Sequence, residues 1–108
     1  MSTVEYVKGS DLPDLAITWT DTNGDVIDFS TGWTFTARVG VAGQEAQLTK
    51  TEHISGAATA PNVVVAWDAG ELDALDARVW TCQVTALHSA TGKERIRTLL
   101  LQILEAMT

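Results

Sequence analysis

The sequence predicts a single all-β domain over residues 1–108, folded as a sandwich of about seven antiparallel strands. Two observations favour this fold class. Apolar and polar residues alternate with the period of two that half-buried strands require. Turn signals recur at short intervals, as in sandwiches and barrels, at Gly9-Ser10, Asn23-Gly24, Thr31-Gly32, Ala42-Gly43, Ser55-Gly56, Ala69-Gly70 and Thr91-Gly92. Such short connections favour antiparallel pairing, because parallel strands need crossovers of about a dozen residues or more.

The alternation predicts which side of each strand faces the core. The expected inward residues are Leu15, Ile17, Trp19, Trp33, Phe35, Ala37, Val39, Val63, Val65, Trp67, Trp80, Cys82, Val84, Ala86, Leu99, Leu101 and Ile103. A more polar strand over residues 45–54, with Leu48 pointing inward, is expected at a sheet edge, where Lys50 and Glu52 would discourage stray pairing. Asp68–Leu75 has the composition of one short helical turn, with Asp68 as its cap.

Charge and hydropathy exclude several partners. The net charge is −7, from 14 acidic and 7 basic residues, which argues against nucleic acid because phosphate binding needs clustered Lys and Arg. The most apolar stretch, Leu99–Leu104, is far shorter than the about 20 residues of a membrane-spanning helix. We therefore expect a soluble protein without a membrane partner. The single cysteine, Cys82, is expected to be a small buried residue.

No motif in the chain indicates catalysis. There is no Gly-rich phosphate loop, HExxH, CxxC or nucleophile elbow, and neither His53 nor His88 has a second ligand at metal-binding spacing. Asp21–Asp25 resembles the start of a calcium loop, but Gly32 stands where the twelfth position of that loop needs a bidentate Glu. We expect no enzyme activity, no metal, no cofactor and no small-molecule substrate.

The last strand, from about Glu94 to Leu104, carries the candidate interface. Ile96, Leu100 and Leu104 share the phase opposite to Leu99 and would form an apolar stripe on the solvent-facing side of the sheet. Because a monomer rarely exposes a large contiguous apolar patch, either a neighbour covers the stripe or a bulge shifts the strand's phase.

Three basic residues begin the same strand. Lys93, Arg95 and Arg97 share one face at strand spacing. That face is either simply solvated or a contact for an acidic neighbour. Together with the apolar stripe, these residues complete the candidate interface.

Two parts of the chain resemble a known family. Gly9-Ser10-Asp11-Leu12-Pro13-Asp14-Leu15 is followed by a strand to Trp19, by Asp21-x-x-Gly24, and by Val26-Ile27-Asp28-Phe29 before Gly32. This arrangement resembles the immunoglobulin-like domain at the N-terminus of upper baseplate proteins of tailed phages. The second half matches more loosely, through a Val63-x-x-x-Trp67 strand, an acidic turn, a strand led by Trp80 and a turn at Gly92. Ala77-Arg78 departs from the pattern, because a Gly-containing turn is common there.

The resemblance implies an immunoglobulin-like sandwich with a structural role in a virion. We expect a non-enzymatic component of the tail, baseplate or tail-fibre attachment region, made in the host cytoplasm and contacting other virion proteins and copies of itself. One alternative is a capsid decoration protein. Another is a carbohydrate-binding module for host attachment, which would need exposed aromatic residues or an acidic calcium site. The inward phase of all four tryptophans favours core packing instead.

Overall fold

The computed structural model describes residues 3–8, 14–41, 43–68, 71–72 and 74–105, and it places eight strands in two sheets. The strands are β1 (Thr3–Val7), β2 (Leu15–Ile17), β3 (Trp33–Gly40), β4 (Leu48–Lys50), β5 (Ile54–Gly56), β6 (Val63–Val65), β7 (Val79–His88) and β8 (Glu94–Leu104). Within these described ranges there is no helix, and hence none that is long and apolar enough to cross a membrane.

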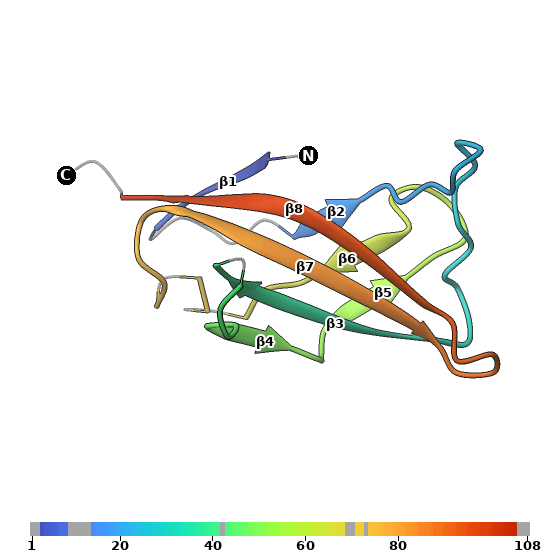
Figure 1. Ribbon diagram of the computed structural model, residues 1–108. Coiled ribbons are helices and arrows are strands. Elements are labelled where there is room, and N and C mark those ends of the chain that lie inside the picture. Colours follow the sequence, from blue (N-terminus) through green and yellow to red (C-terminus); the bar gives the residue numbers. More distant parts are fainter. Residues whose placement is uncertain (1–2, 9–13, 42, 69–70, 73, 106–108) are drawn as a thin grey trace.

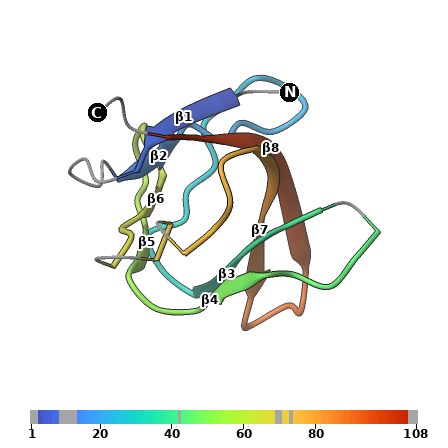
Figure 2. The same cartoon turned by 90° about the vertical axis from the view of Figure 1, so that its left-hand side faces the viewer.

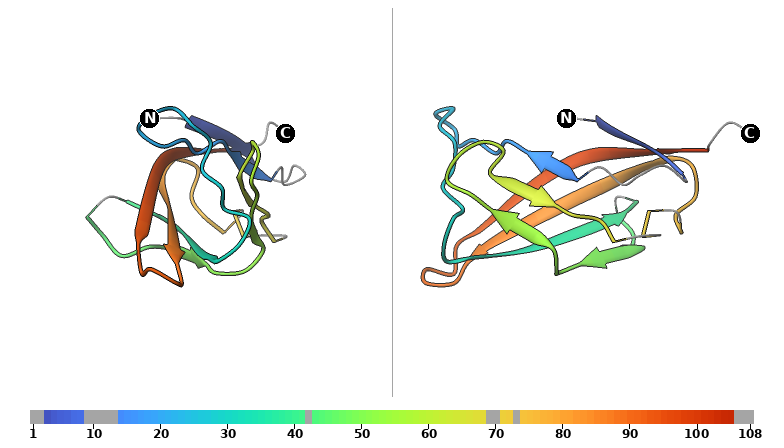
Figure 3. Two further views of the ribbon diagram at one scale, coloured as in Figure 1. Left: turned by 90° about the vertical axis from the view of Figure 1, so that its right-hand side faces the viewer. Right: turned by 180° about the vertical axis from the view of Figure 1, so that it is seen from behind.

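The two sheets form the layers of a sandwich. A five-stranded sheet has the order β1-β8-β7-β3-β4, and a three-stranded sheet has the order β2-β6-β5. Figure 1 shows the larger sheet in front, Figure 2 shows the two layers from one end, and the right-hand view of Figure 3 shows the smaller sheet in front. All paired neighbours are antiparallel except β1, which runs parallel to β8 from Thr3↔Leu100 to Val7↔Leu104. The prediction of an all-β, two-layer domain is confirmed.

The strand count differs from the prediction for two reasons. Residues 3–7 form β1, although no turn-bounded alternation marks them in the sequence. The single polar strand expected over 45–54 is instead two elements, β4 and β5, in different sheets. His53 separates them with a φ of 61°, a left-handed conformation that stops a strand and redirects the chain.

The segment expected to be a short helical turn contains hydrogen-bonded turns in its described part. The Glu71 N–H donates to the Asp68 carbonyl at 3.1 Å, and the Leu75 N–H donates to the Leu72 carbonyl at 3.2 Å. Residues 69–70 and 73 of this segment lie outside the described residues.

The core lies between the sheets and follows the predicted alternation. Of the expected inward residues, all are buried except Trp33, Phe35 and Leu48, which are half-buried and pack against the core. Phe29, from the connection between β2 and β3, was missed by the alternation because it lies in no strand. Its ring sits 5.2 Å from the Trp19 ring and 4.9 Å from the Trp33 ring, between centroids, so aromatic contacts join this connection to the core.

The role assigned to Lys50 is wrong. Strand β4 is indeed an edge of the larger sheet, but the Lys50 side chain is only 3% exposed and does not guard that edge. Its Nζ lies 2.8 Å from Glu71 Oε1 and 3.4 Å from Asp68 Oδ2. Burial by itself lowers the pKa of Lys50, but the two carboxylates outweigh it and raise that pKa above its usual value. Lys50 therefore ties β4 to the turn that follows β6.

Candidate functional site

The outer face of the five-stranded sheet carries the predicted apolar stripe. Leu99, Leu101 and Ile103 are buried at 1–2% exposure, so Ile96, Leu100 and Leu104 point away from the core. The pairing of β7 with β8 runs without interruption from Leu87↔Glu94 to Val79↔Gln102, which excludes a bulge within that span. Ile96 is 55% exposed, whereas Leu100 and Leu104 are half-buried beside β1.

Further apolar residues join this face from neighbouring strands. The large apolar side chains that are exposed in the described part of the chain are Val7, Val26, Val79, Leu87 and Ile96. The register places four of them on the outer face, because Val7 pairs with Leu104, Val79 with Gln102, Leu87 with Glu94 and Ile96 with Thr85. The alternation in the sequence does not indicate Val7, Val79 and Leu87, because their common face depends on strand pairing. The exception is Val26, in the β2–β3 connection.

A groove crosses the same outer face. It has a volume of about 360 Å³ and is lined by residues of β3, β7 and β8 and of the connection from β3 to β4, including Arg38, Gly40, Val41, Thr81, Gln83 and Thr98. From this connection, Gly43, Gln44 and Ala46 also line the groove. The outer face is therefore contoured and mostly uncharged.

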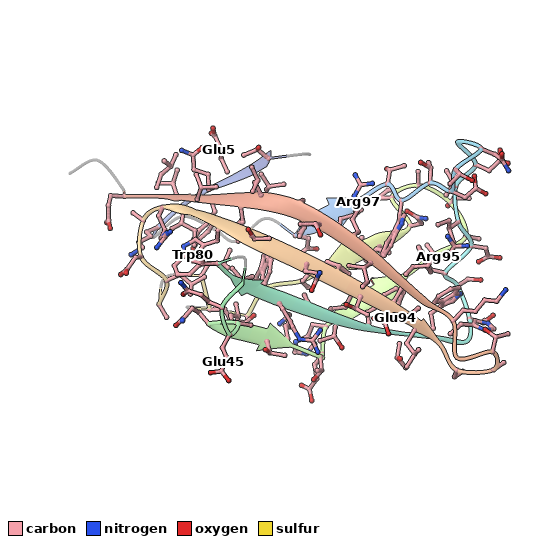
Figure 4. All side chains as sticks on the ribbon, in the orientation of Figure 1. Glu5, Glu45, Trp80, Glu94, Arg95 and Arg97 are labelled. Atoms are coloured by element: carbon pink, nitrogen blue, oxygen red, sulfur yellow. The ribbon has the colours of Figure 1, made fainter. Side chains whose placement is uncertain are left out.

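The structure separates the basic candidates from the apolar ones. Arg95 and Arg97 alternate with Ile96 along β8 and so lie on its opposite face, in phase with Leu99. Unlike Leu99, Arg95 is exposed and Arg97 is half-buried. Lys93 lies just before β8, at the β7–β8 turn. Figure 4 labels Glu94, Arg95 and Arg97 along this first half of the strand.

A second hollow lies where the basic residues meet β3. Its volume is about 460 Å³, and it is lined by Trp33, His88, Thr91, Lys93, Glu94 and Arg95. The Trp33 and His88 rings are 4.8 Å apart, and His88 Nδ1 lies 2.9 Å from Thr91 Oγ1. An aromatic surface beside two cations suits a ligand that combines an apolar face with an acidic group.

The groups most often used in catalysis are otherwise engaged or dispersed. Within the described ranges, no three His, Cys, Asp or Glu side chains gather into a possible metal site. Burial raises the pKa of the Cys82 thiol to about 11, which leaves it protonated and unreactive near neutral pH. His53 Nδ1 lies 3.0 Å from Asp68 Oδ1 on the surface.

Comparisons with protein-family models, with curated proteins and with solved structures find no match to this chain.

Proposed function

We propose that this chain is an immunoglobulin-like module that serves as a non-enzymatic structural component of a tailed-phage virion, in the tail, baseplate or tail-fibre attachment region. It would act through protein–protein contacts with other virion proteins or copies of itself. The observation that carries the assembly role is the gathering of exposed apolar side chains on one sheet face. The virion assignment rests on the resemblance of residues 9–35 described above.

The strand order supports the immunoglobulin-like part of the proposal. The basic strands of such sandwiches are lettered A to G. Strands B, E and D lie in one sheet, and strands G, F and C lie in the other, where some domains add a strand C′ beside C. The order β2-β6-β5 corresponds to B-E-D, and the order β8-β7-β3-β4 corresponds to G-F-C-C′. Strand β1 departs from the simplest pattern, because it pairs with β8 and not with β2.

The outer face supports the assembly role through its composition. Stable protein interfaces bury about 1,200–2,000 Å² in total and are apolar at their centre. Ile96, Val79 and Leu87 are 55%, 46% and 42% exposed, and the uncharged Thr81, Gln83 and Thr85 lie between Val79 and Leu87 on the same face of β7. Covering this face would remove apolar surface from water at about 25 cal/mol per Å².

Detection of the chain in virions tests the proposal directly. We expect mass spectrometry of purified particles to find the chain in a constant ratio to the other tail proteins. Its absence from particles would refute the virion role. A density map that places the chain on the head would instead favour a capsid decoration protein.

Substitutions on the outer face test the mechanism of assembly. Leu87→Ser with Ile96→Ser should leave the fold intact and lower incorporation into particles by about tenfold or more, because the two changes remove exposed apolar side chains from the outer face. Val26→Ser is the matched control, since Val26 is also exposed but lies off this face. Equal incorporation of the two variants would show that the outer face is not the interface.

The hollow beside Trp33 supports a second candidate, a carbohydrate-binding module. Trp33 is half-buried, unlike the other three tryptophans, and an exposed indole can stack on a sugar ring. Lys93 and Arg95 would favour acidic sugars. Binding of uronate oligosaccharides that Trp33→Ala abolishes would support this candidate, and a glycan array without hits would remove it.

A further inference from the structure

The first half of β8 is an open sheet edge. Strand β8 extends over Glu94–Leu104, and the described part of β1, which begins at Thr3, pairs with it over Leu100–Leu104. Over Glu94–Leu99, β8 pairs with β7 on its other side, and no strand within the described ranges covers this edge. An open edge of this length can receive an added strand, which gains main-chain hydrogen bonds along it.

The register shows which backbone groups face the open edge. The His88 N–H donates to the Lys93 carbonyl at 2.8 Å, and the Ile103 N–H donates to the Arg78 carbonyl at 2.9 Å. Lys93 and Ile103 are therefore at hydrogen-bonded positions opposite β7. Because hydrogen-bonded and non-hydrogen-bonded positions alternate in an antiparallel pair, all odd-numbered residues of β8 point their backbone groups at β7. The N–H and C=O groups of Glu94, Ile96 and Thr98 therefore point outward from the edge.

Both sets of candidate residues flank this edge. A strand added beside β8 would place alternate side chains next to Arg95 and Arg97 on one face, and next to Ile96 on the other. Directly opposite side chains in antiparallel strands lie about 4.5–5.5 Å apart between Cβ atoms, close enough for ion pairs and apolar contacts. The best complement is thus an extended segment in which acidic and apolar residues alternate.

Charge makes a second copy of β8 a poor occupant. Three of the seven Lys and Arg residues of this acidic chain lie within residues 93–97. Symmetric antiparallel pairing of two β8 edges about Ile96 would set Arg95 opposite the Arg97 of another copy, and like charges directly opposite are destabilising. The same charges would attract an acidic strand.

We propose that the open edge of β8 over Glu94–Leu99 is a strand-addition site for an extended segment of another protein, with acidic residues on the Arg95 and Arg97 face and apolar residues on the Ile96 face. This inference deepens the proposed assembly role and rests on it, because the segment would belong to a neighbouring structural protein. Specificity comes from the alternation of charge, and main-chain hydrogen bonds supply the affinity.

A synthetic peptide tests the site in the full chain. The probe is an eight-residue peptide of alternating Glu and Val, and the control has the same composition with its four Glu and four Val residues in separate blocks. Titrated into the isotope-labelled protein, the alternating peptide should shift the amide resonances of Glu94, Ile96 and Thr98 and slow their hydrogen exchange by about tenfold or more. The block control should bind about tenfold more weakly.

Variants of the chain separate the backbone and charge contributions. Thr98→Pro removes a donor that faces the open edge and keeps the ladder to β7, so it should abolish peptide binding while the circular dichroism spectrum stays unchanged. Arg97→Glu should weaken binding by about tenfold or more, because it replaces an attractive cross-strand pair by a repulsive one. Arg38→Glu, which changes the same charge on β3 away from the edge, should have no effect.

Several results would overturn the inference. These are equal binding of both peptides, binding that survives both Thr98→Pro and Arg97→Glu, resonance shifts confined to other parts of the sheet, or no binding at a peptide concentration on the order of 1 mM. Dimerisation of the chain through Glu94–Leu99 would overturn it as well. Particles that carry the chain although no peptide binds would refute this inference and leave the assembly role standing. Peptide binding by a chain that is absent from particles would refute the assembly role in a virion and leave the strand-addition site standing.

Discussion

The two halves of β8 share one strand but have different surroundings. The second half, Leu100–Leu104, lies between β1 and β7, and its inward residues Leu101 and Ile103 are 2% and 1% exposed. Among the described residues, the first half, Glu94–Leu99, has a neighbouring strand, β7, on one side only, and it carries exposed Arg95 and Ile96. One half of the strand thus lies within the sheet and its core, and the other leaves backbone and side-chain groups at an edge that no other described strand covers.

The difference teaches that a continuous strand can change role where its neighbour ends. Alternation continues through both halves, with odd-numbered residues on the core side throughout. On that side Arg95 is exposed and Arg97 is half-buried, so cations occupy positions where further along the strand only apolar residues fit. Three measurements sharpen this contrast.

The largest expected effect concerns packing in the second half. Leu101→Ala should lower the free energy of unfolding by about 2–5 kcal/mol, because it leaves a cavity in a buried core. Ile96→Ala in the first half should change it by about 0.5 kcal/mol or less, since that side chain is already exposed. Urea denaturation measures both, and equal losses would contradict the division of β8.

The next effect concerns the boundary between the halves, where Cys82 pairs with Leu99. Burial raises the pKa of this thiol from 9.0 to about 11, so the folded state favours the neutral form. The contribution to stability is fully present below about pH 9 and is lost as pH rises toward 11, when the unfolded chain ionises first.

The loss should reach about 2–3 kcal/mol, at about 1.4 kcal/mol for each pH unit. Cys82→Ala is the control, because it removes the titrating group while other alkaline transitions remain. The difference in unfolding free energy between the two proteins, measured at several pH values, isolates the thiol. If the difference in unfolding free energy stayed constant with pH, the Cys82 thiol would not be shielded from solvent at this boundary.

The smallest effect leaves the fold unchanged and reports on backbone pairing. The amides of Ile96 and Thr98 face the open edge, whereas the amide of Gln102 faces β1. We expect Gln102 to exchange its amide hydrogen slower than Thr98 by a factor on the order of 100, because it is held in a ladder. Similar rates in native-state exchange measured by NMR would mean that the first half is paired after all.

Much of the fold was predictable because it depends on local pattern. Alternation predicted the buried phase of β2, β3, β6, β7 and β8, and the Asn23-Gly24 turn forms as expected, with Gly24 at a φ of 86°. The buried state of Lys50 was not predictable, because its partners Asp68 and Glu71 are distant in sequence. Long-range pairing therefore accounts for the main error.

The candidate interface was likewise only partly predictable, because part of it depends on long-range pairing. The phase of the last strand predicts Ile96 and Arg95, but it does not indicate Leu87 or Val79, whose place on the same sheet depends on the β7–β8 register. The alternation also groups Trp33 with the core tryptophans, whereas that ring is half-buried and lines a hollow with His88.

The sequence by itself determined the class of the fold, the phase of β8 and the concentration of basic residues at the start of that strand, because each is a property of consecutive residues. Only the tertiary structure decided that β1 runs parallel to β8, with Thr3 opposite Leu100 and Val7 opposite Leu104. The open edge follows from that pairing, because the reach of one strand along another is set by the geometry of both. No local pattern in residues 94–99 could reveal that, within the part of the chain that the structure describes, their backbone has a neighbouring strand on one side only.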